Sequence, residues 1–171
     1  LGIKNTITGN GTVRQAMKEH SSALEEGKAD ILGLYMVQRL REKGEITEGV
    51  VMDNYVTFLA GIFRSVRFGA SSAHGRANMI RFNYFNQAGA FSRSEADGTY
   101  RVNKEAFEQA VRDLSNRILT LQGDGNYAEV DAFVAEMGGV SKQLQNDLDR
   151  LASATIPVDI VFEQGVEVLG L

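Results

Sequence analysis

Glu26 and Asp30 carry two carboxylates four residues apart in a stretch predicted to be helical. At 100° per residue they share one side of the helix, roughly opposite the stripe that holds Leu24 and Ile31. The remaining residues on their side are mostly small or apolar, so the pattern predicts that this side is buried as well. Two like charges there repel each other and lose hydration. The sequence therefore predicts a positive group facing both carboxylates.

Three kinds of positive group would serve at this place, namely a metal ion, an arginine or a protonated histidine. A purely structural interpretation also stays open. Glu25 and Glu26 could be solvated, or could pair with Arg39, Arg41 or a residue of another helix. The pattern alone favours this structural interpretation, because ion pairs that only support the fold are common.

A second set of candidate residues lies farther along the chain. His74, Asn78, Arg81 and Phe85 fall on one stripe of a predicted helix. Such a stripe could line a substrate cleft or form a solvated face, and the residues alone do not decide between the two. His20 is six residues before Glu26, about 240° away around a helix, so one metal cannot bind both. We expect His20 to be a surface or partly buried histidine.

The elements that must position these residues are mostly helices. Hydrophobic periodicity and capping residues predict six of them, and an Asp97-Gly98 turn between short alternating runs predicts a β-hairpin. The fold class is therefore mainly α, with one helical domain over residues 1–171 and a β-rich C-terminal tail at 156–169. The helices are expected at 12–43, 47–68, 72–88, 104–122, 127–137 and 141–154.

Composition narrows the classes of function. The chain has 171 residues, no cysteine, a single proline and a net charge of -4. Disulfides and thiolate metal sites are excluded, and the acidic balance with dispersed basic residues argues against nucleic acid as a partner. No apolar run approaches the length of a membrane span, so we expect no membrane partner. Because a cysteine-free chain suits a reducing compartment, we expect a cytoplasmic location.

Two segments resemble a known enzyme family. The run ALEEGKADILGLY at 23–35 resembles the EExxAD/E segment of the dipeptidyl peptidase III family of zinc metallopeptidases. It is closest to the bacterial branch of zinc-dependent hydrolases, some of which are fused to or labelled as Nudix-type proteins. The run SSAHGRANMI at 71–80 is similar to the Ala-His segment that the family carries downstream. The resemblance extends over the whole chain.

The resemblance implies a role for each candidate residue. Glu26 would be a zinc ligand, and Glu25 and Asp30 would orient the histidines that also bind the metal. His74 would assist at the reacting carbonyl or hold the substrate. Asn78, where the eukaryotic members have arginine, and nearby Arg81 would contribute to substrate binding.

The sequence also departs from the family pattern, because it contains no HExxH or HExxGH motif. We therefore expect the chain to be the C-terminal part of the catalytic region of a two-lobed peptidase, with the motif just before Leu1. The intact protein would bind zinc and this chain alone would bind none, because zinc takes three or four ligands. The partners would be an oligopeptide substrate and the remainder of the catalytic region. The alternative is a non-catalytic helical scaffold or interaction domain.

Overall fold

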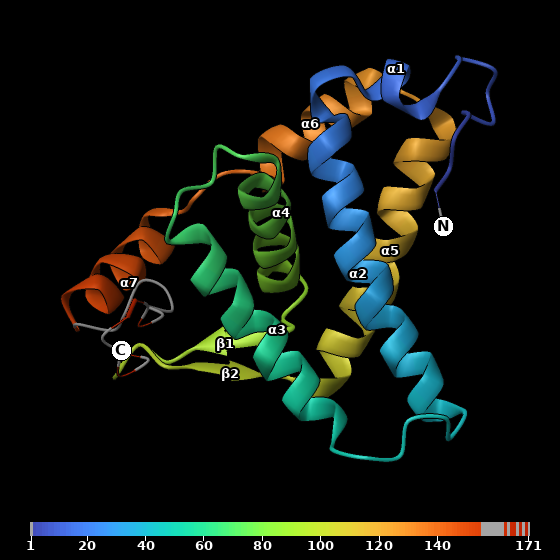
Figure 1. Cartoon of the computed structure of the whole chain (residues 1–171). Coiled ribbons are helices and arrows are strands. Elements are labelled where there is room, and N and C mark those ends of the chain that lie inside the picture. The colour runs from blue at the N-terminus through green and yellow to red at the C-terminus, as the bar shows by residue number, and fades with distance from the viewer. Residues whose placement is uncertain (1, 155–162, 164, 167, 169, 171) are drawn as a thin grey trace.

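Helices dominate the computed structural model, which describes residues 2–154, 163, 165–166, 168 and 170 (Figure 1). The mainly α fold class is confirmed. A short 3-10 helix, η1 (Lys18–His20), connects the first two α-helices, and two strands form one small sheet. The α-helices are α1 (Val13–Met17), α2 (Ser21–Glu42), α3 (Val51–Val66), α4 (Ala73–Gln87), α5 (Lys104–Asp124), α6 (Tyr127–Met137) and α7 (Lys142–Ser153).

The long helix α2 packs against both α4 and α5, and α3 packs against α4 (Figure 1). Aromatic rings fill the space between these helices. Phe107 of α5 lies 4.7 Å from Tyr55 and 4.5 Å from Phe85, measured between ring centroids, and all three side chains are fully buried. Burial of such large rings is the main stabilising contribution of the core. These rings hold α4, which carries His74, against α3 and α5.

The predicted hairpin is confirmed as β1 (Phe91–Arg93) paired antiparallel with β2 (Tyr100–Val102). Gly98 in its turn has a φ of 68°, a conformation that glycine adopts without strain. The hairpin is tied to α7 through Asp147, whose carboxylate accepts two hydrogen bonds of 2.8 Å from Arg93 and one of 2.7 Å from Tyr100.

The prediction of one continuous helix over residues 12–43 is wrong, because the chain bends at Lys18. This residue has a φ of 50°, and the segment is split into α1, η1 and α2. His20 lies in the bend and is buried, whereas we expected a surface or partly buried side chain. Its Nε2 lies 2.9 Å from Asp131 of α6. A contact between distant segments thus determines where the first helix is interrupted.

The other helices match their predicted ranges closely, apart from α3, which begins at Val51 rather than at residue 47. The predicted β-rich tail at 156–169 falls mostly outside the described residues. In the part of the chain that is described, no helix has the length and apolar character needed to cross a membrane.

Candidate active site

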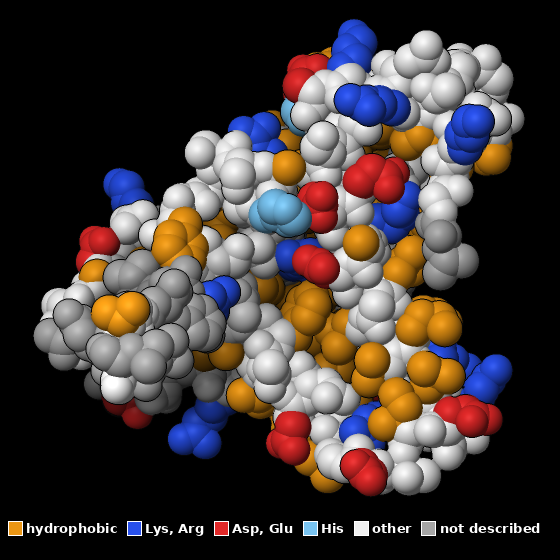
Figure 2. All heavy atoms as spheres, in the orientation of Figure 1, with side chains coloured by type: hydrophobic (Ala, Val, Ile, Leu, Met, Phe, Trp, Pro, Cys, Tyr) orange, Lys and Arg blue, Asp and Glu red, His pale blue; other side chains and the backbone are white. Residues whose placement is uncertain are grey.

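The face of α2 that carries Glu26 and Asp30 is open to solvent in the described part of the chain. Their side chains are 42% and 54% exposed. Figure 2 shows acidic, basic and histidine side chains gathered over the middle of α2 and α4, beside a patch of hydrophobic ones. The prediction that this face is buried is therefore wrong for these residues. The reason is that the described core lies against the opposite side of α2, where Leu24 and Ile31 are fully buried.

Glu26 faces a histidine across the contact between α2 and α4. Its Oε2 lies 3.4 Å from Nδ1 of His74, which is 70% exposed. The position of His74 is fixed locally, since Ser72 caps α4 by accepting a hydrogen bond of 3.0 Å from the backbone N–H of Gly75. A Cβ at Gly75 would lie 2.6 Å from the carbonyl oxygen of Gly69, so only glycine allows this close approach.

Asp30 faces an arginine that is almost completely buried. Nη1 of Arg81 donates a hydrogen bond of 2.6 Å to Oδ2 of Asp30, and Nη2 donates one of 2.6 Å to Oδ1 of Asn78. Asn78 in turn donates to Oγ of Ser65 at 2.7 Å and to the carbonyl oxygen of His74 at 2.9 Å. Burial lowers the pKa of the Arg81 guanidinium, while Asp30 and, more weakly, Glu26 favour its charged form.

Glu25 is held by two residues that are themselves buried. Lys28 lies one turn along α2 and donates a hydrogen bond of 2.8 Å to the Glu25 carboxylate. Gln122 of α5 donates another of 2.8 Å. The position of Glu25 is thus fixed by the fold. Arg39 and Arg41, the alternative partners of the acidic residues, bind elsewhere: Arg39 pairs with Glu42 and Arg41 donates to loop carbonyl groups.

Five of the six candidate residues therefore lie at the α2–α4 contact, although they come from separate segments: Glu26, Asp30, His74, Asn78 and Arg81. Glu25 is held at the neighbouring contact between α2 and α5. Asp30 faces an arginine, one of the positive groups considered, whereas Glu26 faces a histidine, which is positive only when it is protonated. The structure places Asn78 and Arg81 in a buried hydrogen-bonded chain, and their assignment to substrate binding stays a prediction. The contribution of Ser65 was not foreseen, because a serine on the next helix carries no signal in the sequence.

The residues present fit a zinc site only in part. Carboxylate oxygen and imidazole nitrogen are ordinary zinc ligands, so Glu26 and His74 have suitable chemistry. Among the described residues, however, no group of three histidine, cysteine or acidic side chains is arranged to hold a metal ion. The further ligands of a three- or four-coordinate zinc would have to come from other residues.

Two open depressions border these side chains. One, of about 500 Å³, includes Glu25 and Glu26 together with Lys4 and Arg14 in its walls. The other, of about 390 Å³, runs between α2 and α3 and begins at Asp30.

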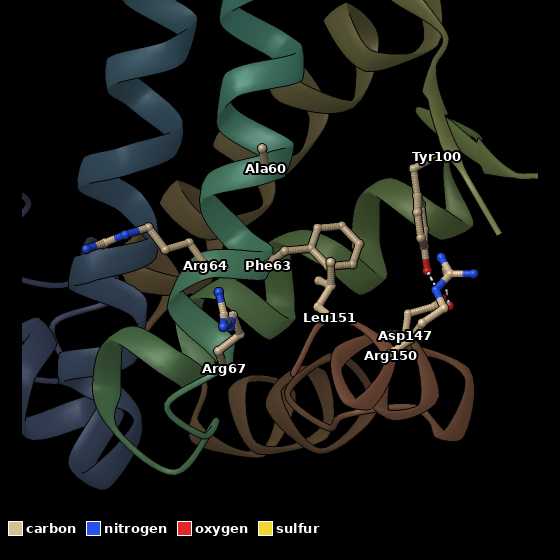
Figure 3. Close-up of a pocket in the computed structure, with 8 residues that line it drawn as sticks. All are labelled: Ala60, Phe63, Arg64, Arg67, Tyr100, Asp147, Arg150 and Leu151. Carbon is tan, nitrogen blue, oxygen red and sulfur yellow. Dashed lines mark hydrogen bonds and ion pairs between the residues drawn. The ribbon is translucent and has the colours of Figure 1, made fainter. Parts of the chain in front are cut away.

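A separate cavity of about 350 Å³ lies between α3, β2 and α7 (Figure 3). Its wall includes Phe63, Tyr100, Asp147 and Leu151, and Figure 3 shows the Tyr100 hydroxyl pointing toward the Asp147 carboxylate. None of the six candidate residues lines this cavity.

No family model matches the chain. The chain is 41% identical over 149 residues, which are 87% of its length, to a protein of Arabidopsis thaliana named Nudix hydrolase 3. The match spans only 19% of that protein.

Two solved structures share the fold of the chain. One is of DPP III from Caldithrix abyssi, with a TM-score of 0.85 and 39% identity, covering 92% of this chain and 30% of that one. The other is of dipeptidyl-peptidase III from Corallococcus sp. strain EGB, with a TM-score of 0.84 and 40% identity, covering 92% and 29%. The chain thus spans less than a third of the length of these proteins. Their agreement confirms the resemblance inferred from the sequence: this chain has the fold of a region of the dipeptidyl peptidase III proteins.

Proposed function

We propose that this chain is part of a zinc-dependent peptidase and that Glu26 supplies one ligand to the metal. The observation that carries the proposal is the approach of Glu26 and His74 to 3.4 Å on an open surface, in a region with the dipeptidyl peptidase III fold. A zinc ion bound there would polarise the scissile carbonyl group and lower the pKa of its bound water.

The remaining roles belong to side chains of this chain. Nδ1 of His74 faces Glu26, so Nε2 is the ring atom left to contact the peptide substrate. We assign it the hydrogen bond that stabilises charge on the reacting carbonyl oxygen. Asp30 and Glu25 would orient histidine ligands, and the fixed position of each carboxylate suits that task.

The substrate in this proposal is an oligopeptide, and the rest of the catalytic region is the partner. That region would supply the other zinc ligands and cover the open face of α2, where Gly33 is exposed and Val37 is half-buried. The chain would then form one helical domain of a two-lobed enzyme, with substrate bound between the lobes. The length of the solved relatives, more than three times that of the matched segment, supports such an arrangement.

Metal content and turnover of the full-length protein test this proposal. Glu26→Ala should lose its zinc, because one protein ligand is removed. His74→Ala should keep zinc and lose kcat by roughly 10²–10³-fold, as when one transition-state donor is deleted. The control is Glu136→Ala, which changes an exposed acidic residue on α6 and should keep both the zinc content and the turnover of the wild type. Full zinc occupancy and unchanged turnover in Glu26→Ala would contradict the proposal.

The alternative is a helical scaffold without chemistry. Its supporting observation is that Asp30 and Glu25 already have positive partners within the chain, at 2.6 and 2.8 Å. On this hypothesis the full-length protein would contain no stoichiometric zinc and would cleave no peptide, and the Glu26→Ala variant would behave as wild type.

A further inference from the structure

Four polar side chains from three helices form one continuous hydrogen-bonded chain beneath the candidate site. It begins at Ser65 on α3, passes through Asn78 and Arg81 on α4, and ends at Asp30 on α2. Each of its three hydrogen bonds is 2.6 or 2.7 Å long. Such a chain transmits the position of one helix to a side chain on another.

The central member of this chain is a buried cation. Arg81 is 2% exposed, and a buried charge costs several kcal/mol unless it is paired. Its guanidinium also lies 5.5 Å from the ring centroid of Phe58, on the side of α3. The planar fork of arginine can bind Asp30 and Asn78 at the same time, which the single ammonium group of lysine cannot do with equal geometry.

Asp30, the last member of this hydrogen-bonded chain, is held through only one of its two carboxylate oxygens. Oδ2 accepts the hydrogen bond from Arg81, while the side chain as a whole is 54% exposed. No described residue donates a hydrogen bond to Oδ1. The residue stands one turn after Glu26, a rise of about 6 Å along α2. The Asp30 carboxylate is therefore fixed in direction, and it is open to a group from outside the described residues.

We propose that Arg81 is a positioning residue, a buried cation that Ser65 and Asn78 hold in place so that it aims the Asp30 carboxylate at the metal site. This inference rests on the proposed function. It gives Arg81 and Asn78 a role without contact with the substrate. Arg81 sets the orientation of Asp30, and Asp30 orients a ligand of the metal.

The test is a double-mutant cycle in zinc affinity, measured by competition with a chelator on the full-length protein. Arg81→Met and Asp30→Asn should each weaken zinc binding by about 10–100-fold, which is the usual cost of removing a residue that orients a metal ligand. The double variant should bind zinc no more weakly than Asp30→Asn alone, because Arg81 acts through Asp30. Additive losses would overturn the proposal, since a residue that only supports the fold would not depend on Asp30.

Two further variants guard against simple unfolding. Ser65→Ala is a mild change at the far end of the chain and should weaken zinc binding in the same direction by a smaller factor. Arg81→Lys keeps the cation and should recover part of the affinity lost in Arg81→Met. Arg76→Met, which removes a half-buried arginine of the same helix, is the control and should leave affinity unchanged. If Ser65→Ala matches wild type, the chain does not transmit position.

These outcomes separate the inference from the proposed function. If Glu26→Ala retains zinc, the proposed function fails. If Glu26→Ala loses zinc while Arg81→Met binds it as tightly as Arg76→Met, only the positioning role fails.

Discussion

In the part of the chain that the structure describes, two aspartate–arginine pairs join distant segments, and they are built in opposite ways. At the α2–α4 contact the arginine is buried and the aspartate open, with 3% and 54% of the side chains of Arg81 and Asp30 exposed. Between β1 and α7 the aspartate is buried and the arginine less so, with values of 4% for Asp147 and 19% for Arg93.

The difference indicates what each pair can do. Asp147 accepts hydrogen bonds from both Arg93 and Tyr100, so its carboxylate is occupied within the fold. It locks α7 to the hairpin and has little capacity for another partner. Among the described residues only Arg81 donates to the Asp30 carboxylate, and 54% of the Asp30 side chain is exposed. An open carboxylate on a buried cation is suited to binding something further, whereas a saturated buried carboxylate is suited to stability.

The largest loss of stability is expected where a buried charge loses its closest partner. Arg93→Met should lower the free energy of unfolding by about 3 kcal/mol, because the buried Asp147 would lose two hydrogen bonds and keep only Arg150, 3.7 Å away, as its cation. Denaturant unfolding of the chain measures this value. The control, Arg101→Met, changes an exposed arginine of the same hairpin and should stay within about 0.5 kcal/mol of wild type. Equal effects of the two variants would show that the pair adds no stability.

Acid should weaken the same pair in a defined range of pH. The hydrogen bonds from Arg93, with a smaller contribution from Tyr100, lower the pKa of Asp147 from 3.8 to about 2. Because the folded pKa lies below the unfolded value, the stabilisation is complete above about pH 5 and is lost as the pH falls toward 2. It should amount to about 2–3 kcal/mol. Denaturant unfolding at a series of pH values measures this stabilisation. Asp147→Asn should reduce the slope of the free energy of unfolding against pH. A slope unchanged in that variant would contradict the assignment.

The smallest loss of stability is expected at the pair of Arg81 and Asp30, and it should depend on which partner is removed. Asp30→Ala removes the carboxylate from Arg81, but Asn78 still accepts from Nη2 and water can enter from the open side where Asp30 lay, so the change should cost only about 1–3 kcal/mol. Arg81→Met leaves an aspartate that water can solvate and fills the space with a side chain of similar length, so it should cost less than about 1.5 kcal/mol. Thermal unfolding of both variants gives the comparison. The reverse order would mean that packing around Arg81 outweighs its charge.

Much of the fold followed from local patterns. The bounds of α6 and the turn at Gly98 were predicted almost to the residue, because capping residues and glycine act over a few positions. The bend at Lys18 was missed, because it depends on the burial of His20 against α6, far along the chain. No periodicity within residues 12–43 records that contact.

The candidate active site likewise depends partly on local sequence patterns and partly on contacts between distant segments. The sequence determined that Glu26 and Asp30 share one face of a helix, since the spacing of residues along a helix fixes the direction of their side chains. It also identified the segment around His74. Only the tertiary structure decided that His74 faces Glu26 and that Arg81, held by Asn78 and Ser65, faces Asp30. The physical reason is that these contacts depend on how α2, α3 and α4 pack against a shared core, and packing is a property of all the helices together.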